Sequence, residues 1–263
     1  MARSSDQQKF AALKLLLDEK ADQYNTPEFI QSDPISIPHQ LSKKEDIEIM
    51  GFIIASIAWG NRLAILKSGD KLLDIMGHEP YAFVQHASKK DLQDLNFVHR
   101  TFNKTDLTFF IHALRNLYAQ KIGLEGAFGG VKFKGTLKDR IVHFRNTLFE
   151  TTHERRSEKH ISSPLSNSAC KRINMYLRWM VRNDKRNVDF GIWKSISMSE
   201  LHLPLDVHTG RVARDLGILN RTKDDWQALE ELMVVLQKMD AKDPVKYDFA
   251  LFGIGVNEYK KRS

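Results

Sequence analysis

The chain has 263 residues, enough to bury a sizeable core in one large domain or in two closely packed lobes. Hydrophobic residues make up 42% and charged residues 28%, a composition typical of a globular and not of a disordered protein. The formal net charge is +7, and the single cysteine, Cys170, excludes an internal disulfide, a cysteine-rich zinc site and a four-thiolate iron–sulfur cluster.

Two features of the sequence predict where the protein works. The first residues, "MARSSDQQKF", contain no apolar run of the kind found in signal peptides. The longest apolar stretch, "GFIIASIAW", is too short to cross a bilayer as a helix. We therefore expect a soluble, cytoplasmic protein without a membrane partner.

Helical periodicity dominates the first 150 residues. Residues 46–77 predict two core helices separated near Gly60, and the first is apolar on most sides. Other amphipathic patterns predict helices at residues 7–24, 89–95, 106–122 and 136–150. The Gly-rich stretch "GAFGGVKFKG", residues 126–135, matches no nucleotide-binding motif and predicts a turn or a short hairpin. No segment predicts a strand, so we expect an all-α fold.

Residues 138–186 carry the excess positive charge, with twelve Lys and Arg against five Asp and Glu. A localised positive surface attracts polyanions, most commonly DNA or RNA, whereas the alternative is a solvated and salt-bridged pair of helices. A predicted helix in residues 170–186 has one apolar face, made by Ile173, Tyr176, Leu177 and Met180. Its other face is expected to form a cationic stripe of Lys171, Asn174, Arg178, Arg182 and Lys185.

Three helices are predicted toward the end of the chain. Asp206 follows the apolar segment Leu-Pro-Leu and is predicted to cap a helix that stops at Gly217. A capping box from Thr222 to Asp225 is expected to start the next helix. Residues 243–259 predict a final core helix.

Three hypotheses compete for the chemistry of this region. His202, Asp206 and His208 could ligate a metal ion, although their spacing crosses a proline and a helix start. Alternatively, the cationic stripe and the amides at a helix N-terminus could bind phosphates without any chemistry, although a carboxylate at that terminus would repel them. The third hypothesis is a catalytic pair of Lys171 and Asp206.

Lysine and aspartate together suit the cleavage of a base from deoxyribose. Lys171 opens a predicted helix, where the positive end of the helix dipole disfavours an added positive charge and favours a nucleophilic amine. Asp206 caps another predicted helix and stays anionic, so it can accept a proton or stabilise a developing cation. Each residue alone is better explained as an exposed lysine or an ordinary helix cap, and only the combination favours catalysis.

The sequence resembles the helix-hairpin-helix (HhH-GPD) DNA glycosylases, a superfamily with a hairpin of the type LPGVGxKTA and a downstream [VL]DxHVxRV segment. Residues 165–173, "LSNSACKRI", are similar to the hairpin, and residues 205–217, "LDVHTGRVARDLG", are similar to the second segment. Further likeness in "DIEIMGFIIASIAWGNR" and "YDFALFGIG" extends the resemblance over residues 46–257. The spacing of 35 residues from Lys171 to Asp206 is nearest to the archaeal type of 8-oxoguanine glycosylase.

More narrowly, three segments resemble a family of uncharacterised bacterial proteins that is attached to this superfamily. They are "ACKRINMYLRWMVR", "VDFGIWK" and "DPVKYDFALFGIG". Two hairpin glycines of the superfamily are replaced by Asn167 and Ala169, of which Asn tolerates a left-handed turn and Ala does not. No cysteine follows "FGIG", so the iron–sulfur cluster of endonuclease III is not expected.

The resemblance implies an all-α, two-lobed helix-hairpin-helix glycosylase-like fold with the active cleft between the lobes. Residues 46–172 are expected to form one helical domain that ends in the hairpin-like segment, and residues 1–45 with 173–263 the other. The resemblance also makes Lys171 and Asp206 the catalytic residues. It implies a base-excision repair glycosylase, with or without AP-lyase activity, that removes a damaged base such as an oxidised purine.

The expected partner is duplex DNA with a damaged base, bound by a monomer that needs no cofactor or metal. The residues expected to contact DNA are Asn61, Asn167, Arg172, Arg178, Arg182 and Arg211. Phe190, Trp193 and His208 are candidates for a base pocket, although one of the two aromatic residues is expected in the core. The competing hypothesis is a non-catalytic DNA- or RNA-binding protein on the same scaffold.

Overall fold

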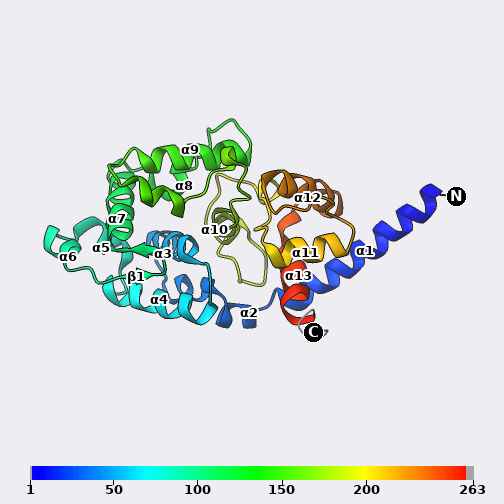
Figure 1. Cartoon of the computed structure of the whole chain (residues 1–263), viewed down its shortest axis with the longest axis horizontal. Helices are drawn as coiled ribbons and strands as arrows, with labels where there is room; N and C mark the ends of the chain where they lie inside the picture. The colour runs from blue at the N-terminus through cyan, green and yellow to red at the C-terminus, as the bar shows by residue number, and fades with distance from the viewer. Residues whose placement is uncertain (1, 259–263) are drawn as a thin grey trace.

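A computed structural model describes residues 2–258, and this part of the chain is mostly helical (Figure 1). Its α-helices are α1 (Ala2–Tyr24), α2 (Pro27–Ser32), α3 (Lys44–Ile57), α4 (Arg62–Ile75), α5 (Pro80–His86), α6 (Lys89–Gln93), α7 (Lys104–Ala119), α8 (Gly123–Ala127), α9 (Leu137–Phe149), α10 (Lys171–Val181), α11 (Val207–Asp215), α12 (Trp226–Met239) and α13 (Tyr247–Gly253). Short 3-10 helices are η1 (Pro34–Ser36), η2 (Pro38–Gln40), η3 (Arg155–His160), η4 (Pro164–Ser166), η5 (Met198–Glu200) and η6 (Pro244–Lys246), and α13 continues into a π-helix, Ile254–Glu258.

The expectation of a chain without strands is wrong at one place. The strands β1 (Val98–His99) and β2 (Phe102–Asn103) pair in antiparallel fashion and form a very short hairpin. Arg100 lies in the turn with a left-handed φ of 55°. Of the two alternatives expected at residues 126–135, a turn or a short hairpin, the structure has turns, which follow the end of α8 at Ala127.

The helices lie in two groups with α10 between them (Figure 1). Helices α3 to α9 gather on one side of the view, and α1, α11, α12 and α13 gather on the other. The short helices η1 and η2 pack against α3, and η1 also contacts α4, so residues 34–40 lie with the first group. The exact division into two lobes that we expected from the sequence stays a prediction.

Helices α3 and α10 form the centre of the core, as the sequence predicted for α3. Gly51 of α3 faces Tyr176 and Met180 of α10 so closely that a Cβ atom there would lie 3.1 Å from the Met180 methyl carbon. The rings of Phe52 and Tyr176 meet edge to face with their centroids 5.7 Å apart. The apolar face predicted for residues 170–186 is therefore confirmed, and its burial fixes the orientation of α10.

Several predicted helix boundaries are confirmed. The chain breaks between α3 and α4 near Gly60, Asp206 caps α11, and Gly217 follows α11 with a left-handed φ of 71°. The capping box from Thr222 is wrong, because α12 begins at Trp226 and its cap is Asp225. The predicted final helix corresponds to α13 and the π-helix, and residue 259 lies outside the described residues.

Across residues 2–258, the structure has no helix of the length and apolar content needed to cross a membrane.

Candidate active site

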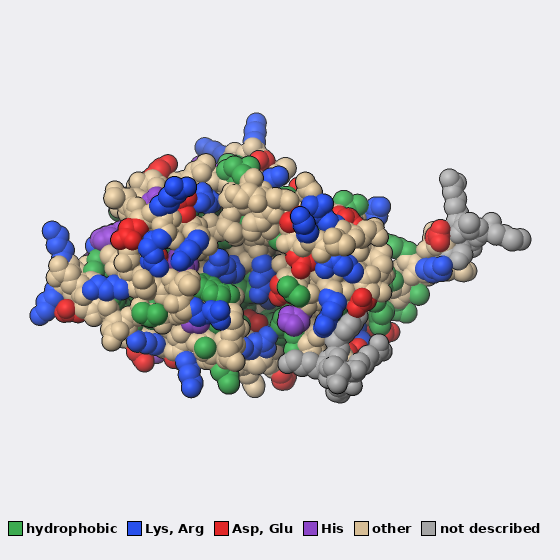
Figure 2. All heavy atoms as spheres, viewed as in Figure 1, with side chains coloured by type: hydrophobic (Ala, Val, Ile, Leu, Met, Phe, Trp, Pro, Cys, Tyr) green, Lys and Arg blue, Asp and Glu red, His purple; other side chains and the backbone are tan. Residues whose placement is uncertain are grey.

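A cleft with a volume of about 850 Å³ lies where the two groups of helices meet α10. Side chains from α2 and η1, the turn between α3 and α4, α10, the start of α11 and α13 line it. Its volume falls in the range that small-molecule sites occupy, so it can hold a single nucleotide. On the face shown in Figure 2, Lys and Arg side chains gather around the hollow between the two halves of the molecule.

The predicted catalytic pair meets in this cleft. Nζ of Lys171 lies 3.6 Å from Oδ2 of Asp206, although 35 residues separate them in the chain. Both side chains line the cleft, and they retain 33% and 23% of their exposed surface, so a ligand can reach both groups. The structure thus brings the two residues together as the resemblance implied.

Asp206 is held by the helix that it caps. Its Oδ1 accepts hydrogen bonds from the backbone N–H groups of His208 and Thr209, at 3.0 and 3.1 Å, at the start of α11. The other oxygen, Oδ2, therefore points toward Lys171 in a fixed orientation. The preceding residues 203–205 are buried and anchor the approach to the cap, which explains the apolar segment before this aspartate.

The hairpin-like segment positions Lys171. Asn167 and Cys170 both adopt left-handed backbone conformations, with φ of 57° and 48°, and Lys171 begins α10 directly afterwards. The side-chain N–H of Asn167 donates to Oδ2 of Asp225 over 3.1 Å. The backbone carbonyl of Asn167 accepts a hydrogen bond from the Trp226 N–H over 3.0 Å. These bonds fix the turn against α12 and occupy the Asn167 side chain, so the DNA contact predicted for it has no support.

Ala169 stands where the superfamily hairpin has its second glycine, but it does not adopt a left-handed conformation. The second left-handed residue of this turn is Cys170. The N–H groups of Asn167, Ser168 and Cys170 donate to oxygens of Pro164, Ser163 and Ser168 within the same segment. These amides are engaged in shaping the turn. A phosphate would have to displace those bonds, so the segment serves mainly to orient Lys171.

One wall of the cleft is built around Trp59. The guanidinium of Arg172 lies 4.9 Å from the ring centroid of Trp59 and also donates to the carbonyl oxygens of Ser56 and Lys159. The imidazole of His160 stacks on Trp59 with centroids 5.8 Å apart, and burial lowers the pKa of His160 to about 4. Arg172 therefore lines the cleft and its bonds hold the aromatic wall in place, while the DNA contact expected of it stays a prediction.

The floor of the cleft contains a carboxyl group that the sequence analysis did not identify. Asp248 of α13 is buried, lines the cleft and pairs with Nη1 of Arg178. Burial raises the pKa of Asp248 to about 6, while Arg178 opposes the shift and Asp206 adds to it. The quoted segment "YDFALFGIG" contained this residue, but it suggested only a closing helix.

The cationic stripe predicted on α10 is wrong. Arg178 and Arg182 are only 3% and 2% exposed, and Asn174 is fully buried. Arg178 pairs with Asp189 and Asp248, and Arg182 pairs with Asp184, Asp189 and Asp243, so both guanidinium groups are neutralised within the protein. Arg178 reaches the cleft floor, but neither arginine offers a surface for DNA.

The predicted base pocket is also corrected in part. Trp193 is buried in the core, where its Nε1–H donates to Oε1 of Glu48 over 2.6 Å. Phe190 packs on the ring of His39, with centroids 4.3 Å apart. Neither belongs to the described residues that line the cleft, whereas His208 does and is exposed. Phe29 and Phe252 line the cleft instead, with their ring centroids 6.3 Å apart.

Cations at the rim come mostly from residues that the sequence analysis did not select. Arg62 of α4 lines the cleft and lies 5.4 Å from the ring centroid of Phe252. Arg100 packs over Gly60, whose left-handed φ of 95° and missing Cβ make room for it. Asn61 is exposed, but its Oδ1 accepts from the Ala64 N–H and caps α4. Arg211 is exposed on α11.

The residues proposed for a metal site do not converge. His202 stacks on Trp226, with centroids 5.4 Å apart, and its Nδ1 contacts the carbonyl oxygen of Glu200. Within residues 2–258, no group of three or more His, Cys, Asp and Glu side chains is arranged to hold a metal ion. The metal hypothesis is therefore wrong for His202, Asp206 and His208.

Comparison with known proteins places the chain in one family. A family model described as "Protein of unknown function (DUF2400)" matches residues 33–257. The chain belongs to this family. The match covers the whole cleft except for Phe29. No curated protein and no solved structure gives a significant match, so the resemblance to the helix-hairpin-helix glycosylases stays a prediction.

Proposed function

We propose that the protein is a DNA glycosylase of the helix-hairpin-helix type, which removes a damaged base from duplex DNA. The observation that carries this proposal is the distance of 3.6 Å between Nζ of Lys171 and Oδ2 of Asp206 in an open cleft. An amine and a carboxylate at this distance can act on the same sugar carbon. The size of the cleft supports an everted nucleotide as the ligand.

The chemistry assigns a different task to each group. Lys171 attacks C1′ of the deoxyribose as the base leaves, and Asp206 stabilises the positive charge that develops on the sugar and accepts a proton from the amine. Because Oδ1 of Asp206 is held by two backbone N–H groups, Oδ2 is directed at the reacting atoms before the substrate binds. The resulting Schiff base makes strand cleavage by β-elimination accessible to the same lysine.

The surroundings of the cleft support a nucleic acid as the substrate. Arg62 lines the cleft and Arg100 packs over Gly60 of its lining, so both can approach backbone phosphates, which dominate the affinity of DNA-binding proteins. Trp59, Phe29 and Phe252 provide aromatic surface on which an everted base can stack. The cleft lining thus combines aromatic rings for a base with cations for phosphates.

Borohydride trapping tests this proposal directly. Duplex oligonucleotides that carry 8-oxoguanine, uracil or an abasic site are incubated with the protein and reduced, and covalent adducts are resolved by electrophoresis. We expect an adduct with at least one duplex, and we expect Lys171→Gln to abolish it. The matched control is Lys185→Gln, which removes one positive charge from an exposed site outside the described cleft lining and is expected to leave the adduct unchanged.

The alternative is a DNA- or RNA-binding protein without catalytic activity. It is favoured by Arg62 and Arg100 beside the cleft, because phosphate binding alone would explain them. This alternative predicts that binding persists in Lys171→Gln and that the wild-type protein gives no adduct with any of the three duplexes.

A further inference from the structure

Asp248 is a buried carboxyl group of the cleft lining that the proposed chemistry leaves without a task. It projects from α13 into the cleft that Lys171 and Asp206 share, and only 6% of its surface is exposed. A buried acid beside a reacting centre is costly unless its charge is compensated or it carries a proton. The charges around Asp248 decide which of these states it adopts.

Charged groups from several elements face this carboxyl. Arg178 and Lys171 of α10 favour its ionised form, whereas Asp206 at the start of α11 and Asp189 in the loop after α10 favour its protonated form. Asp33 at the start of η1 also lines the cleft, and its negative charge helps to raise the pKa of Arg178. The balance gives Asp248 the near-neutral pKa described above, so both forms are accessible near pH 6.

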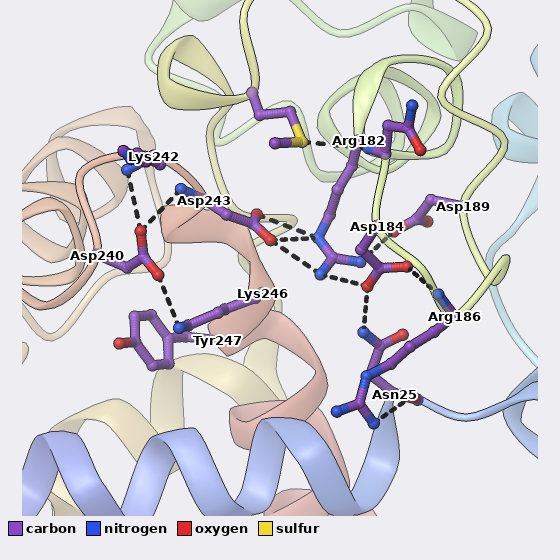
Figure 3. Close-up of polar contacts among 12 residues, drawn as sticks. Asn25, Arg182, Asp184, Arg186, Asp189, Asp240, Lys242, Asp243, Lys246 and Tyr247 are labelled. Carbon is purple, nitrogen blue, oxygen red and sulfur yellow. Dashed lines mark hydrogen bonds and ion pairs between the residues drawn. The ribbon is translucent and has the colours of Figure 1, made fainter.

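A buried chain of ion pairs lets Asp248 change its charge without leaving Arg178 uncompensated. Nε of Arg178 lies 3.2 Å from Oδ1 of Asp189, whose Oδ2 lies 3.1 Å from Nη1 of Arg182. Arg182 is held in turn by Asp184 and Asp243, at 2.8 and 2.9 Å (Figure 3). When Asp248 is protonated, Arg178 keeps Asp189 as its partner.

We propose that Asp248 is the acid that protonates the departing base, a role that rests on the proposed glycosylase function. The bond between C1′ and the base nitrogen breaks, and its electron pair passes to the base. The proton of Asp248 moves to a ring nitrogen of that base. Lys171 forms the new bond to C1′ and passes its proton to Asp206. Asp248 remains as a carboxylate paired with Arg178 and regains a proton from solvent before the next turnover.

This role separates two reactions that share the same lysine. Removal of a base needs an acid for the leaving group, whereas an abasic site carries no base to protonate. Loss of Asp248 should therefore impair base excision and spare the covalent reaction with an abasic site. A purely structural role of Asp248 would impair both reactions to the same extent.

The experiment compares Asp248→Asn with the wild-type protein on the duplexes carrying 8-oxoguanine, uracil and an abasic site. We expect base excision by Asp248→Asn to fall at least about 100-fold, while borohydride trapping on the abasic duplex stays within about threefold of the wild-type rate. The matched control is Asp243→Asn, which removes a carboxylate partner of Arg182 at a position outside the described cleft lining. It is expected to change both rates in parallel.

A second measurement needs no variant. Both wild-type reactions depend on the amine of Lys171, so the ratio of the excision rate to the abasic trapping rate cancels that dependence. We expect this ratio to be constant below about pH 6 and to fall about tenfold per pH unit above it, because the protonated fraction of Asp248 falls in that way.

Three results would overturn the role of Asp248. They are a parallel loss of both reactions in Asp248→Asn, a wild-type ratio that does not fall above pH 6, and an enzyme that traps the abasic site but removes no base. A wild-type protein that gives neither an adduct nor excision refutes the proposed function itself, and the role of Asp248 with it.

Discussion

Asp206 uses its two carboxylate oxygens for different purposes. Oδ1 caps α11 through two backbone N–H groups, and Oδ2 faces the amine of Lys171. The sequence predicted the cap because the residue stands at the end of an apolar segment and before a helical pattern. The contact with Lys171 could only be inferred from the resemblance, since nothing in the spacing of 35 residues fixes a distance in space.

Asp206→Asn separates the structural and chemical roles of this residue. Asn caps a helix about as well as Asp, so we expect the free energy of unfolding to change by less than about 1 kcal/mol. Base excision should fall at least about 100-fold, because the amide is neutral and cannot stabilise the sugar cation. Asp139→Asn makes the same change in the capping box of α9, outside the described cleft lining, and excision should persist. Equal excision by both variants would contradict the assignment.

His160 provides a prediction about pH. Its pKa is lowered to about 4 by burial, so the unfolded chain binds a proton more readily than the folded protein below pH 6.5. The stability that its neutral form contributes is complete above pH 6.5 and is lost as the pH falls toward 4. We expect the wild-type protein to lose about 2 kcal/mol more than His160→Asn between pH 7 and pH 4.5, as measured by urea unfolding.

The elements were largely predictable, but their surroundings were not. Hydrophobic periodicity located α3, α4, α7, α9 and the apolar face of α10, because burial in one core imposes that pattern. The same periodicity placed Arg178 and Arg182 on an exposed face. Their partners, among them Asp189, Asp243 and Asp248, lie at other places in the chain, and a pattern within one helix contains no information about them.

Substitution of a buried, ion-paired arginine and of an exposed arginine beside the cleft should have different effects. Arg182→Ala leaves Asp243 without its buried cation and Asp189 with Arg178 alone, so we expect unfolding to become easier by about 3 kcal/mol. Arg100→Ala should leave stability nearly unchanged but weaken binding to an abasic duplex and reduce the slope of log affinity against log salt by about 1. Thermal melts and binding titrations at several salt concentrations measure both effects. A reversed pattern would contradict the correction made for α10.

At the scale of the whole molecule, the site depends on contacts between distant segments. The cleft combines residues from η1, the end of α3, α10, the start of α11 and α13, and the core between them is continuous. The sequence identified a mostly helical chain and five residues of the cleft lining, whereas Trp59, Phe252 and Asp248 emerged only from the fold. The segment around each of these three residues gives no sign of a site, because the role of each residue depends on neighbours from other elements.

The net charge of +7 can be interpreted only when the positions of the charged side chains in the whole fold are known. Much of the positive charge of residues 138–186 is consumed in internal ion pairs, including those of Arg145, Arg156, Arg178 and Arg182. The cations available to a polyanion lie instead around the cleft, where Figure 2 shows them gathered. Charge counted along the sequence therefore misplaced the cationic surface, and the polyanionic partner that it predicts stays a prediction.

The central claim is that the amine of Lys171 forms a covalent bond with the sugar carbon of an abasic or damaged nucleotide. The most direct measurement is mass spectrometry of the borohydride-reduced complex after digestion with nuclease and trypsin. We predict that the reduced deoxyribose remnant is attached to residue 171. An adduct on a different lysine, or none on any of the three duplexes, would contradict the account.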